Sequence, residues 1–235
     1  MIANRHAFAI ALTLAGLAAL AGLPPQHLIG DAKAQETKSQ ETKSQDTKAQ
    51  SAAAALVAKP VSLPDMALGS AKASITIVEY ASMSCPHCAA FEQNVFPMLK
   101  SKYIDTGKVR FVFREFPLDI KAAAASMLAR CIAGNDAAKY FDAIEQLFKA
   151  QDALMEHTTD TLKAIGKQQS GMSEEAVEAC EKDQALLDKV KADQSFAFET
   201  LKVDATPTFF VNGERLRGAM SFEEIDEKIR SLLKR

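Results

Sequence analysis

Apolar side chains recur along this chain at two spacings, which predict its strands and helices. Residues 75–80 form a run of β-branched and aromatic side chains typical of a buried strand. Residues 109–114 alternate between apolar and polar side chains, as a half-buried strand does. Between these runs, helical spacing predicts a helix over residues 91–103. Its core-facing stripe consists of Phe91, Val95, Phe96 and Leu99.

The C-terminal pattern predicts a hairpin followed by a helix. Residues 208–211 and 214–216 are typical of two strands, and Asn212-Gly213 between them is a strong signal for a two-residue hairpin turn. Ser221 is placed to cap a final helix with a regular apolar face. The β-α-β beginning and the ββα end match the two halves of a thioredoxin fold.

About ninety residues separate Pro117 from Pro207, far more than a βαβ unit of roughly thirty residues requires. Helix signals fill this excess. A first helix is capped by Asp119 and stops at Gly134, a second spans residues 140–148, a short third is capped by Thr159 and ends before Gly171, a fourth begins at Ser173, and a longer fifth includes residues 186–190. We therefore predict an α/β protein with a thioredoxin fold and an inserted α-helical subdomain at about residues 119–195.

The first 34 residues have the parts of a secretory signal peptide. Arg5 precedes an apolar run over residues 7–23, and Ala32-Lys33-Ala34 supplies a small-residue cleavage signal. The run is long and the cleavage signal is distant, so an uncleaved N-terminal membrane anchor is the alternative. No other stretch approaches the length of a membrane span. We therefore expect the mature protein to be exported.

A polar repeat follows this leader. The unit QETKS starts at Gln35, recurs at Gln40 and returns in altered form at Gln45. Such a segment has too few apolar side chains to bury surface, so we expect a disordered linker over residues 35–59, with a lone charged helix as the alternative. The folded domain is expected over residues 60–235, an ordinary size for one domain.

The charge balance bears on the partners. Without residues 1–34 the chain loses two of its 28 basic and one of its 30 acidic side chains, which leaves a net charge of −3. Domains that bind nucleic acid usually carry a basic excess, so we expect no nucleic-acid partner.

The most informative motif is Cys85-Pro86-His87-Cys88, which lies between a predicted strand and a predicted helix. Two cysteines at this spacing form either a redox disulfide or half of a zinc site. A structural zinc site needs four ligands, and the chain otherwise offers only the two isolated cysteines Cys131 and Cys180 and four histidines, two of them in the leader. The strand-helix context favours a redox pair, and we expect no metal and no cofactor beyond the disulfide.

The position of the motif predicts different roles for its residues. Cys85 would lie at a helix N-terminus, where free N–H groups and the helix dipole favour a thiolate, so we expect it to be the exposed nucleophile. Cys88 falls one turn into the helix and is expected to be the buried resolving thiol. Pro86 has no hydrogen-bond donor to lose at the first helical position.

His87 is the candidate for tuning the thiolate. A helix N-terminus contributes at most about 2 kcal/mol to an anion, whereas a hydrogen bond to an anion adds roughly 1.5–3 kcal/mol. We expect the ring of His87 to supply such a bond to the sulfur of Cys85. A solvated loop histidine with no such role is the alternative.

The chain resembles the periplasmic thiol:disulfide oxidoreductases of the DsbA type, a branch of the thioredoxin superfamily. The resemblance runs from about residue 65 to the C-terminus. It is carried by the segments EYASMSCPHC at residues 79–88, REFP at residues 114–117 and TPTFFVNG at residues 206–213, and by the helical insertion.

The resemblance implies an activity and partners. Members of the family oxidise cysteines of newly exported, unfolded proteins in the periplasm and are reoxidised by a quinone-linked membrane partner. It also implies that Glu79 lies beneath the active site and assists proton transfer at Cys88, and that Pro207 is a cis proline beside the disulfide. Thr206 would then offer backbone hydrogen bonds to an extended substrate, in the manner of an added strand.

Cys131 and Cys180 lie near the ends of predicted insertion helices, and an exported chain has few reasons to keep two free thiols. We expect a structural disulfide between them, with two separate buried cysteines as the alternative.

Other functions remain open on the same scaffold. A disulfide isomerase or reductase is one alternative, although the chain has no evident dimerisation module and we expect a monomer. A thioredoxin-fold binding protein or chaperone with an inert disulfide is another. An inert pair would resist reduction, whereas the pair of an oxidant reacts readily with dithiols.

Overall fold

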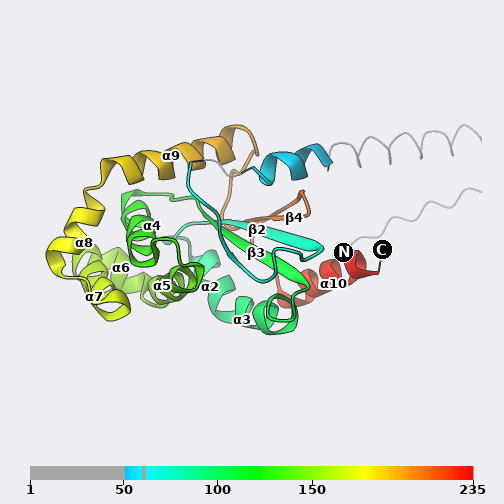
Figure 1. The fold of residues 1–235 in the computed structure, drawn as a ribbon, viewed down its shortest axis with the longest axis horizontal. Coiled ribbons are helices and arrows are strands. Elements are labelled where there is room, and N and C mark those ends of the chain that lie inside the picture. Colours follow the sequence, from blue (N-terminus) through cyan, green and yellow to red (C-terminus); the bar gives the residue numbers. More distant parts are fainter. Residues whose placement is uncertain (1–50, 60–61, 235) are drawn as a thin grey trace, which may run out of the picture. The chain divides into compact units, whose positions relative to one another are not determined.

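A five-stranded mixed sheet forms the centre of the fold (Figure 1). The computed structural model describes residues 51–59 and 62–234; the expected leader and most of the expected linker lie outside these ranges. The strand order is β1-β3-β2-β4-β5, with β2 parallel to β3 and the other neighbours antiparallel. The strands are β1 (Met66–Leu68), β2 (Ile75–Ala81), β3 (Val109–Glu115), β4 (Thr208–Val211) and β5 (Glu214–Arg217). The short edge strand β1 was not predicted from the sequence.

Alternation along β2 sends its side chains into two separate cores, because successive residues of a strand face opposite sides of the sheet. Ile75 and Ile77 belong to the larger cluster, which includes residues of the helix that follows β2. Val78 and Tyr80 belong to a second cluster on the other face, with residues from the end of α9 (Gln184–Glu199). Glu79 is two residues after Ile77, so its side chain lies on the same face of the sheet. This is the face that carries the CPHC helix.

The helix after β2 is interrupted. The structure has α2 (Pro86–Asn94), a break at Val95, α3 (Phe96–Leu99) and a π-helical turn, η1 (Lys100–Ile104), where one helix was predicted over residues 91–103. Pro97 explains the break, because its ring clashes with the carbonyl four residues earlier and it has no N–H to donate.

The long insertion is helical, as predicted (Figure 1). Its helices are α4 (Ile120–Ala133), α5 (Ala137–Lys149), α6 (Gln151–Glu156), α7 (Thr158–Ser170), α8 (Glu174–Glu181) and α9. The side chain of Asp119 accepts a hydrogen bond from the N–H of Ala122, and Gly134 ends α4, so both predicted boundaries are confirmed. Ser173 caps α8 as expected.

The prediction that Thr159 caps a short helix is wrong. The capping position of α7 is His157, an exposed residue, and the helix continues for 13 residues to Ser170. The break between α6 and α7 is confined to His157. The hydroxyl of Thr158 donates a hydrogen bond across it to the carbonyl of Leu154, at 2.8 Å. Thr159 is therefore inside the helix.

A buried ionic cluster fixes the insertion to the end of β3. Arg130 on α4 makes an ion pair with Glu115, and the hydroxyl of Tyr140 on α5 donates a hydrogen bond to the same carboxylate. Arg130 also donates to the carbonyl of Pro64 at 2.7 Å. The two partners of the ion pair are 6% and 3% exposed in their side chains, so losing one of them would leave a buried charge without a partner.

The C-terminal hairpin and helix have the predicted form. Asn212 and Gly213 both have positive φ, 47° and 85°, as the favoured two-residue hairpin turn requires. Ser221 and Glu224 form a reciprocal capping box at the start of α10 (Phe222–Leu233).

Residues 51–59 differ from the predicted disordered linker, of which they are the described part. Residues 51–57 are helical, and the side chain of Val57 is buried in the second cluster. A Cβ added to Gly213 would lie 2.5 Å from the Cβ of Ala54, so this helix lies directly against the hairpin turn. Alanine-rich sequence and the apolar contact of Val57 explain the order here. No helix within the described ranges is long and apolar enough to cross a membrane.

Candidate active site

Cys85 is the N-cap of α2 and follows the C-terminal end of β2. Its backbone is extended, and its sulfur accepts a hydrogen bond from the N–H of Cys88 at 3.3 Å. Pro86 occupies the first helical position, where its missing N–H costs nothing. A sulfur thus takes the place that a Ser or Asp oxygen usually has at a helix N-terminus, and the interaction strengthens when the sulfur is anionic.

The loop before β4 covers the sulfur of Cys85 from a second side. The Sγ atom lies 3.3 Å from the backbone oxygen of Thr206. Packing between α2 and β4 holds these elements together, because the rings of Phe91 and Phe209 are 4.7 Å apart. Cys85 is 4% exposed, so the prediction that this residue is exposed is wrong. The covering loop, which is 121 residues away in the chain, is the reason.

The environment lowers the pKa of Cys85 to about 5 from an ordinary value of 9.0. The largest cause is the hydrogen bond with the side chain of Cys88, and the side chain of Thr206 adds a further lowering. The backbone N–H groups of Cys88 and His87 contribute in the same direction, while burial opposes the shift. Cys85 is therefore a thiolate at neutral pH in the reduced protein.

Cys88 has the opposite character. It is fully buried, and burial is the largest cause that raises its pKa far above the ordinary value. The hydrogen bond with Cys85 and the charge of Glu79 raise it further. The two thiols are free in this structure, one ionised and one protonated at neutral pH.

Glu79 lies in the core on the same side of the sheet. It is 1% exposed, and its Oε2 atom has no hydrogen-bond partner among the described residues. Burial raises its pKa well above the ordinary value, and the charges of Glu92 and Cys85 act in the same direction. Burial therefore favours the protonated form of this carboxyl group. The charge that Glu79 carries when ionised raises the pKa of Cys88, so the two groups are electrostatically coupled.

Two buried residues near the motif were missed in the sequence. Glu92, one turn after Cys88 on the buried side of α2, is 5% exposed, and burial raises its pKa to about 8. A carboxyl group within an apolar helical stripe was the available signal. Gln151, the first residue of α6, donates hydrogen bonds from its side chain to the carbonyl oxygens of Met83 and Cys85. No local pattern marks it, because it is 66 residues away from Cys85 in the chain.

The remaining residues of the motif are on the surface. Pro86 and His87 are both exposed, and the backbone N–H of His87 is among the groups that lower the pKa of Cys85. The Thr206–Pro207 peptide bond is cis, and Pro207 is buried while Thr206 is half-buried. The structure thus brings together Cys85, Cys88, Glu79 and Thr206, which the sequence distributes over 128 positions.

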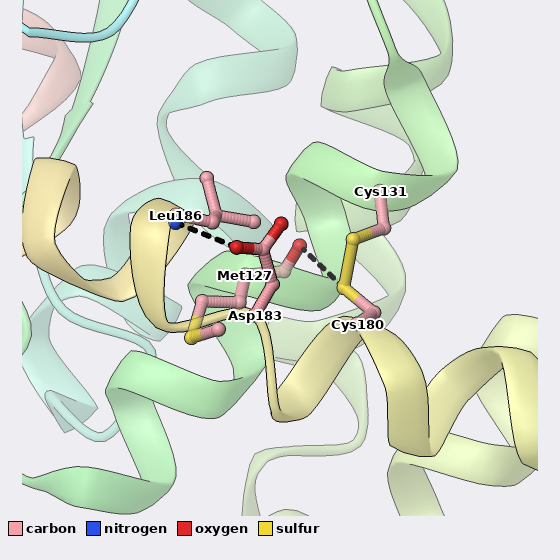
Figure 2. The surroundings of a disulfide bond; sticks show 5 residues. All are labelled: Met127, Cys131, Cys180, Asp183 and Leu186. Atoms are coloured by element: carbon pink, nitrogen blue, oxygen red, sulfur yellow. Dashed lines mark hydrogen bonds between the residues drawn. A yellow bond between two sulfur atoms is a disulfide. The ribbon is translucent and has the colours of Figure 1, made fainter.

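Cys131 and Cys180 form a disulfide between α4 and α8, outside this cluster (Figure 2). Their sulfur atoms are 1.98 Å apart and their Cα atoms 6.3 Å apart. The sulfur of Cys180 lies 3.3 Å from the carbonyl oxygen of Met127 on α4. A disulfide sulfur carries no proton, so this is a packing contact rather than a hydrogen bond. Asp183, which caps α9, comes directly after this junction (Figure 2).

Metal ligands do not gather around the motif. Within residues 51–59 and 62–234, no group of three or more His, Cys, Asp or Glu side chains is arranged to hold a metal ion.

Comparisons with known proteins agree with this geometry. A profile of the thioredoxin family matches residues 62–231. The crystal structure of alpha-DsbA1 from Wolbachia pipientis is similar, with 34% sequence identity, a TM-score of 0.68, and coverage of 75% of this chain and 94% of that one. The chain belongs to the thioredoxin family, and within it to the DsbA branch.

Curated relatives point the same way. Disulfide bond formation protein D of Bacillus subtilis is 28% identical over 170 residues, which cover 71% of this chain and 76% of that protein. A Rickettsia bellii protein whose name includes the words "protein-disulfide oxidoreductase" is 38% identical over 151 residues, or 63% of this chain. The match spans only 57% of that protein's own length.

Proposed function

We propose that this protein is an exported thiol:disulfide oxidoreductase that donates the Cys85–Cys88 disulfide to newly secreted proteins. The observation that carries the proposal is that the fold shifts the pKa values of the two thiols in opposite directions. One sulfur caps a helix and has a pKa of about 5, and the other is buried with a raised pKa. Stabilising the thiolate favours the reduced form, and a disulfide whose reduced form is stabilised is readily given away.

The reaction proceeds by two exchanges. A substrate thiolate attacks Sγ of Cys85, the Cys85–Cys88 bond breaks, and Cys88 leaves with the electron pair. A second thiolate of the same substrate then attacks the substrate sulfur of this mixed disulfide, and Cys85 leaves as a thiolate. The substrate gains a disulfide and the protein gains two electrons. The second step is fast because a thiol of low pKa is a good leaving group.

Glu79 supports the first exchange. Cys88 leaves as an anion in an apolar environment that disfavours its charge, so it needs a proton. Burial raises the pKa of Glu79 and so favours its protonated form, and the charge of its ionised form acts on Cys88. We assign it the role of proton donor to the departing thiolate and of acceptor in the reverse reaction.

Thr206 and its surroundings supply the substrate-binding surface. A chain bonded to Cys85 would pass beside the backbone oxygen of Thr206, which lies 3.3 Å from the sulfur. Asp204 lines a groove of about 360 Å³ together with Leu118 and Phe198, whose side chains are largely exposed. Asp204 is two residues before Thr206 in the chain, and the exposed apolar side chains of this groove suit an unfolded substrate.

The cellular setting of the proposal comes from the leader and the family. An exported protein of the DsbA branch would act in the periplasm on unfolded, cysteine-containing proteins. It would be reoxidised by a quinone-linked membrane partner, which takes the two electrons.

The test is stoichiometric oxidation of a reduced, unfolded substrate by the purified oxidised protein. One substrate disulfide should form per Cys85–Cys88 disulfide consumed. Cys88→Ser has no disulfide to donate, but when it is mixed with a disulfide-containing substrate its Cys85 thiolate should attack that disulfide and accumulate as a mixed disulfide, because no Cys88 is present to resolve it. Full activity of Cys85→Ser would show that the nucleophile is assigned wrongly. A pair that resists equilibration with dithiols would instead indicate a binding protein with an inert disulfide.

A further inference from the structure

Gln151 connects the helical insertion to the redox loop. Its side-chain amide nitrogen donates to the carbonyl oxygen of Met83 at 2.8 Å and to that of Cys85 at 3.1 Å. Gln151 is 9% exposed, and both hydrogen bonds are buried. A polar side chain with this degree of burial and two aligned acceptors is held in one place.

The loop between β2 and α2 needs such a partner. Residues 82–85 belong to neither element, so their backbone groups cannot all be satisfied by the sheet or the helix. The N–H of Cys85 donates to the carbonyl of Ser82, and the hydroxyl oxygen of Ser82 accepts from the N–H groups of Ser84 and Leu118. Met83 is fully buried, and Gln151 supplies the donor to its carbonyl.

The second bond of Gln151 acts directly at the reactive residue. The carbonyl of Cys85 also accepts from the N–H groups of Cys88 and Ala89, which form the first turn of α2. Its orientation determines where the Cys85 side chain points relative to that turn. The side-chain donor of Gln151 on α6 fixes this peptide unit. It thereby keeps the sulfur of Cys85 directed at the N–H of Cys88 and at Thr206.

We infer that Gln151 is a positioning residue for the reaction: through the carbonyl oxygens of Met83 and Cys85 it holds the redox loop so that the Cys85 sulfur stays in the capping position of α2. The inference rests on the proposed function of Cys85 as the nucleophile. It assigns the insertion a role at the active site besides covering the core.

A second glutamine provides a matched control. Gln93 near the end of α2 donates its side-chain amide to the carbonyl of Phe148 on α5, at 3.3 Å. This bond also joins the CPHC helix to the region where α5 meets α6, but it is two turns away from the loop. Gln93→Met should therefore lower stability and leave Cys85 unaffected.

The test compares Gln151→Met with Gln93→Met in the reduced protein. Methionine keeps the length of the side chain and removes both donors. We expect Gln151→Met to raise the pKa of Cys85, measured by thiolate absorbance against pH, by about half a unit to one unit. Iodoacetamide labelling at pH 5 should then slow by about two- to sixfold, because the thiolate is the reactive form. The equilibrium with glutathione should shift toward a weaker oxidant.

Two outcomes decide the inference. If Gln151→Met lowers the melting temperature as Gln93→Met does but leaves the pKa of Cys85 and the glutathione equilibrium unchanged, Gln151 is only a packing residue. If Gln151→Met does not fold, Gln151→Asn replaces it. Asparagine keeps the amide group but is one methylene shorter, so its donor cannot reach both carbonyl oxygens and the pKa of Cys85 should again rise. An unchanged pKa of Cys85 in Gln151→Asn overturns the inference.

These measurements do not depend on substrate turnover. Labelling and absorbance report on Cys85 alone, so a failure of the oxidation assay would reject the proposed function without deciding the role of Gln151. Conversely, an unchanged Cys85 in Gln151→Met would leave the proposed function intact.

Discussion

The sulfur of Cys85 lies 3.3 Å from the backbone oxygen of Thr206, although 121 positions separate the two residues. This contact is a hydrogen bond only while Cys85 is protonated, because a thiolate has no proton to donate. The side chain of Thr206 acts in the opposite sense, since its hydrogen bond favours the thiolate. One residue therefore contacts both protonation states of the nucleophile.

Thr206→Val should raise the pKa of Cys85 and make the disulfide a weaker oxidant. Valine has nearly the same shape but no hydroxyl group, so the thiolate loses one hydrogen-bond donor. An expected rise of up to about one unit corresponds to roughly 1.4 kcal/mol. Thiolate absorbance against pH measures it, and Thr206→Ser, which keeps the hydroxyl, is the control. Equal pKa values in all three proteins would contradict this role.

The stability of the reduced protein should depend on pH through Cys85. Its folded pKa of about 5 is below the ordinary value of 9.0, so the thiolate contribution is full above pH 9 and is lost as the pH falls to 5. Between pH 5 and pH 7 the reduced form should gain about 2 kcal/mol relative to the oxidised form. Denaturant unfolding of both forms measures this gain. Cys85→Ser should abolish it, and an unchanged slope in that variant would assign the effect to another group.

His87→Ala and His87→Pro should separate the ring from the backbone. If the ring faces the sulfur, His87→Ala raises the pKa of Cys85 by about one to two units, because a bond of roughly 1.5–3 kcal/mol is lost. His87→Pro also removes the backbone N–H that lowers this pKa, so its rise should be larger. The corresponding loss of oxidising strength is some 30–65 mV for the ring. Glutathione equilibration measures the potential, and a change in His87→Pro alone would exclude the ring.

Glu79→Gln should slow disulfide exchange. The variant keeps the shape of the side chain but cannot transfer a proton to Cys88, and a positioned acid contributes a factor of about one hundred or more in favourable cases. We expect at least a tenfold loss in stopped-flow rates of substrate oxidation. Its stability should also fall less as pH rises, because a buried acid with a raised pKa stabilises the fold at low pH and loses this effect as it ionises. Glu92→Gln removes another buried acid of raised pKa and is the control: an equal loss of rate would indicate a general effect of burial.

Removing the second disulfide should lower stability without removing activity. Cys131 and Cys180 are 49 positions apart, and opening a loop of this length costs about 4 kcal/mol in the entropic description. The double variant Cys131→Ser/Cys180→Ser should unfold at lower denaturant concentration and still oxidise a substrate. Complete loss of activity in a variant that still folds would give this disulfide a role beyond stability.

Local signals were sufficient for most elements of the fold. The alternation in β2 and β3, the Asn212-Gly213 turn and the caps at Asp119 and Ser173 each act over a few residues, and each is present in the structure. The errors have local causes too. Pro97 interrupts a helix that the apolar spacing made continuous, and His157 confines a break to one residue.

The site was predictable only as far as its motif extends. The CPHC sequence marks its own residues, and the family resemblance adds Thr206 and Glu79. Gln151 was missed because its function depends on a contact between the insertion and the loop, which no periodicity encodes. The burial of Cys85 was missed for the same reason, since the covering oxygen comes from Thr206.

The capping of α2 by Cys85 ties the first turn of this helix to the chemistry of the protein. In the reduced state an anionic sulfur accepts the N–H of Cys88, whereas in a disulfide the same sulfur is neutral and a weak acceptor. The Cys88 amide should therefore exchange its hydrogen with solvent more slowly after reduction, and its NMR resonance should shift with it. The exchange rate of a single backbone amide proton, without any added label, would report in real time which fraction of the protein is reduced.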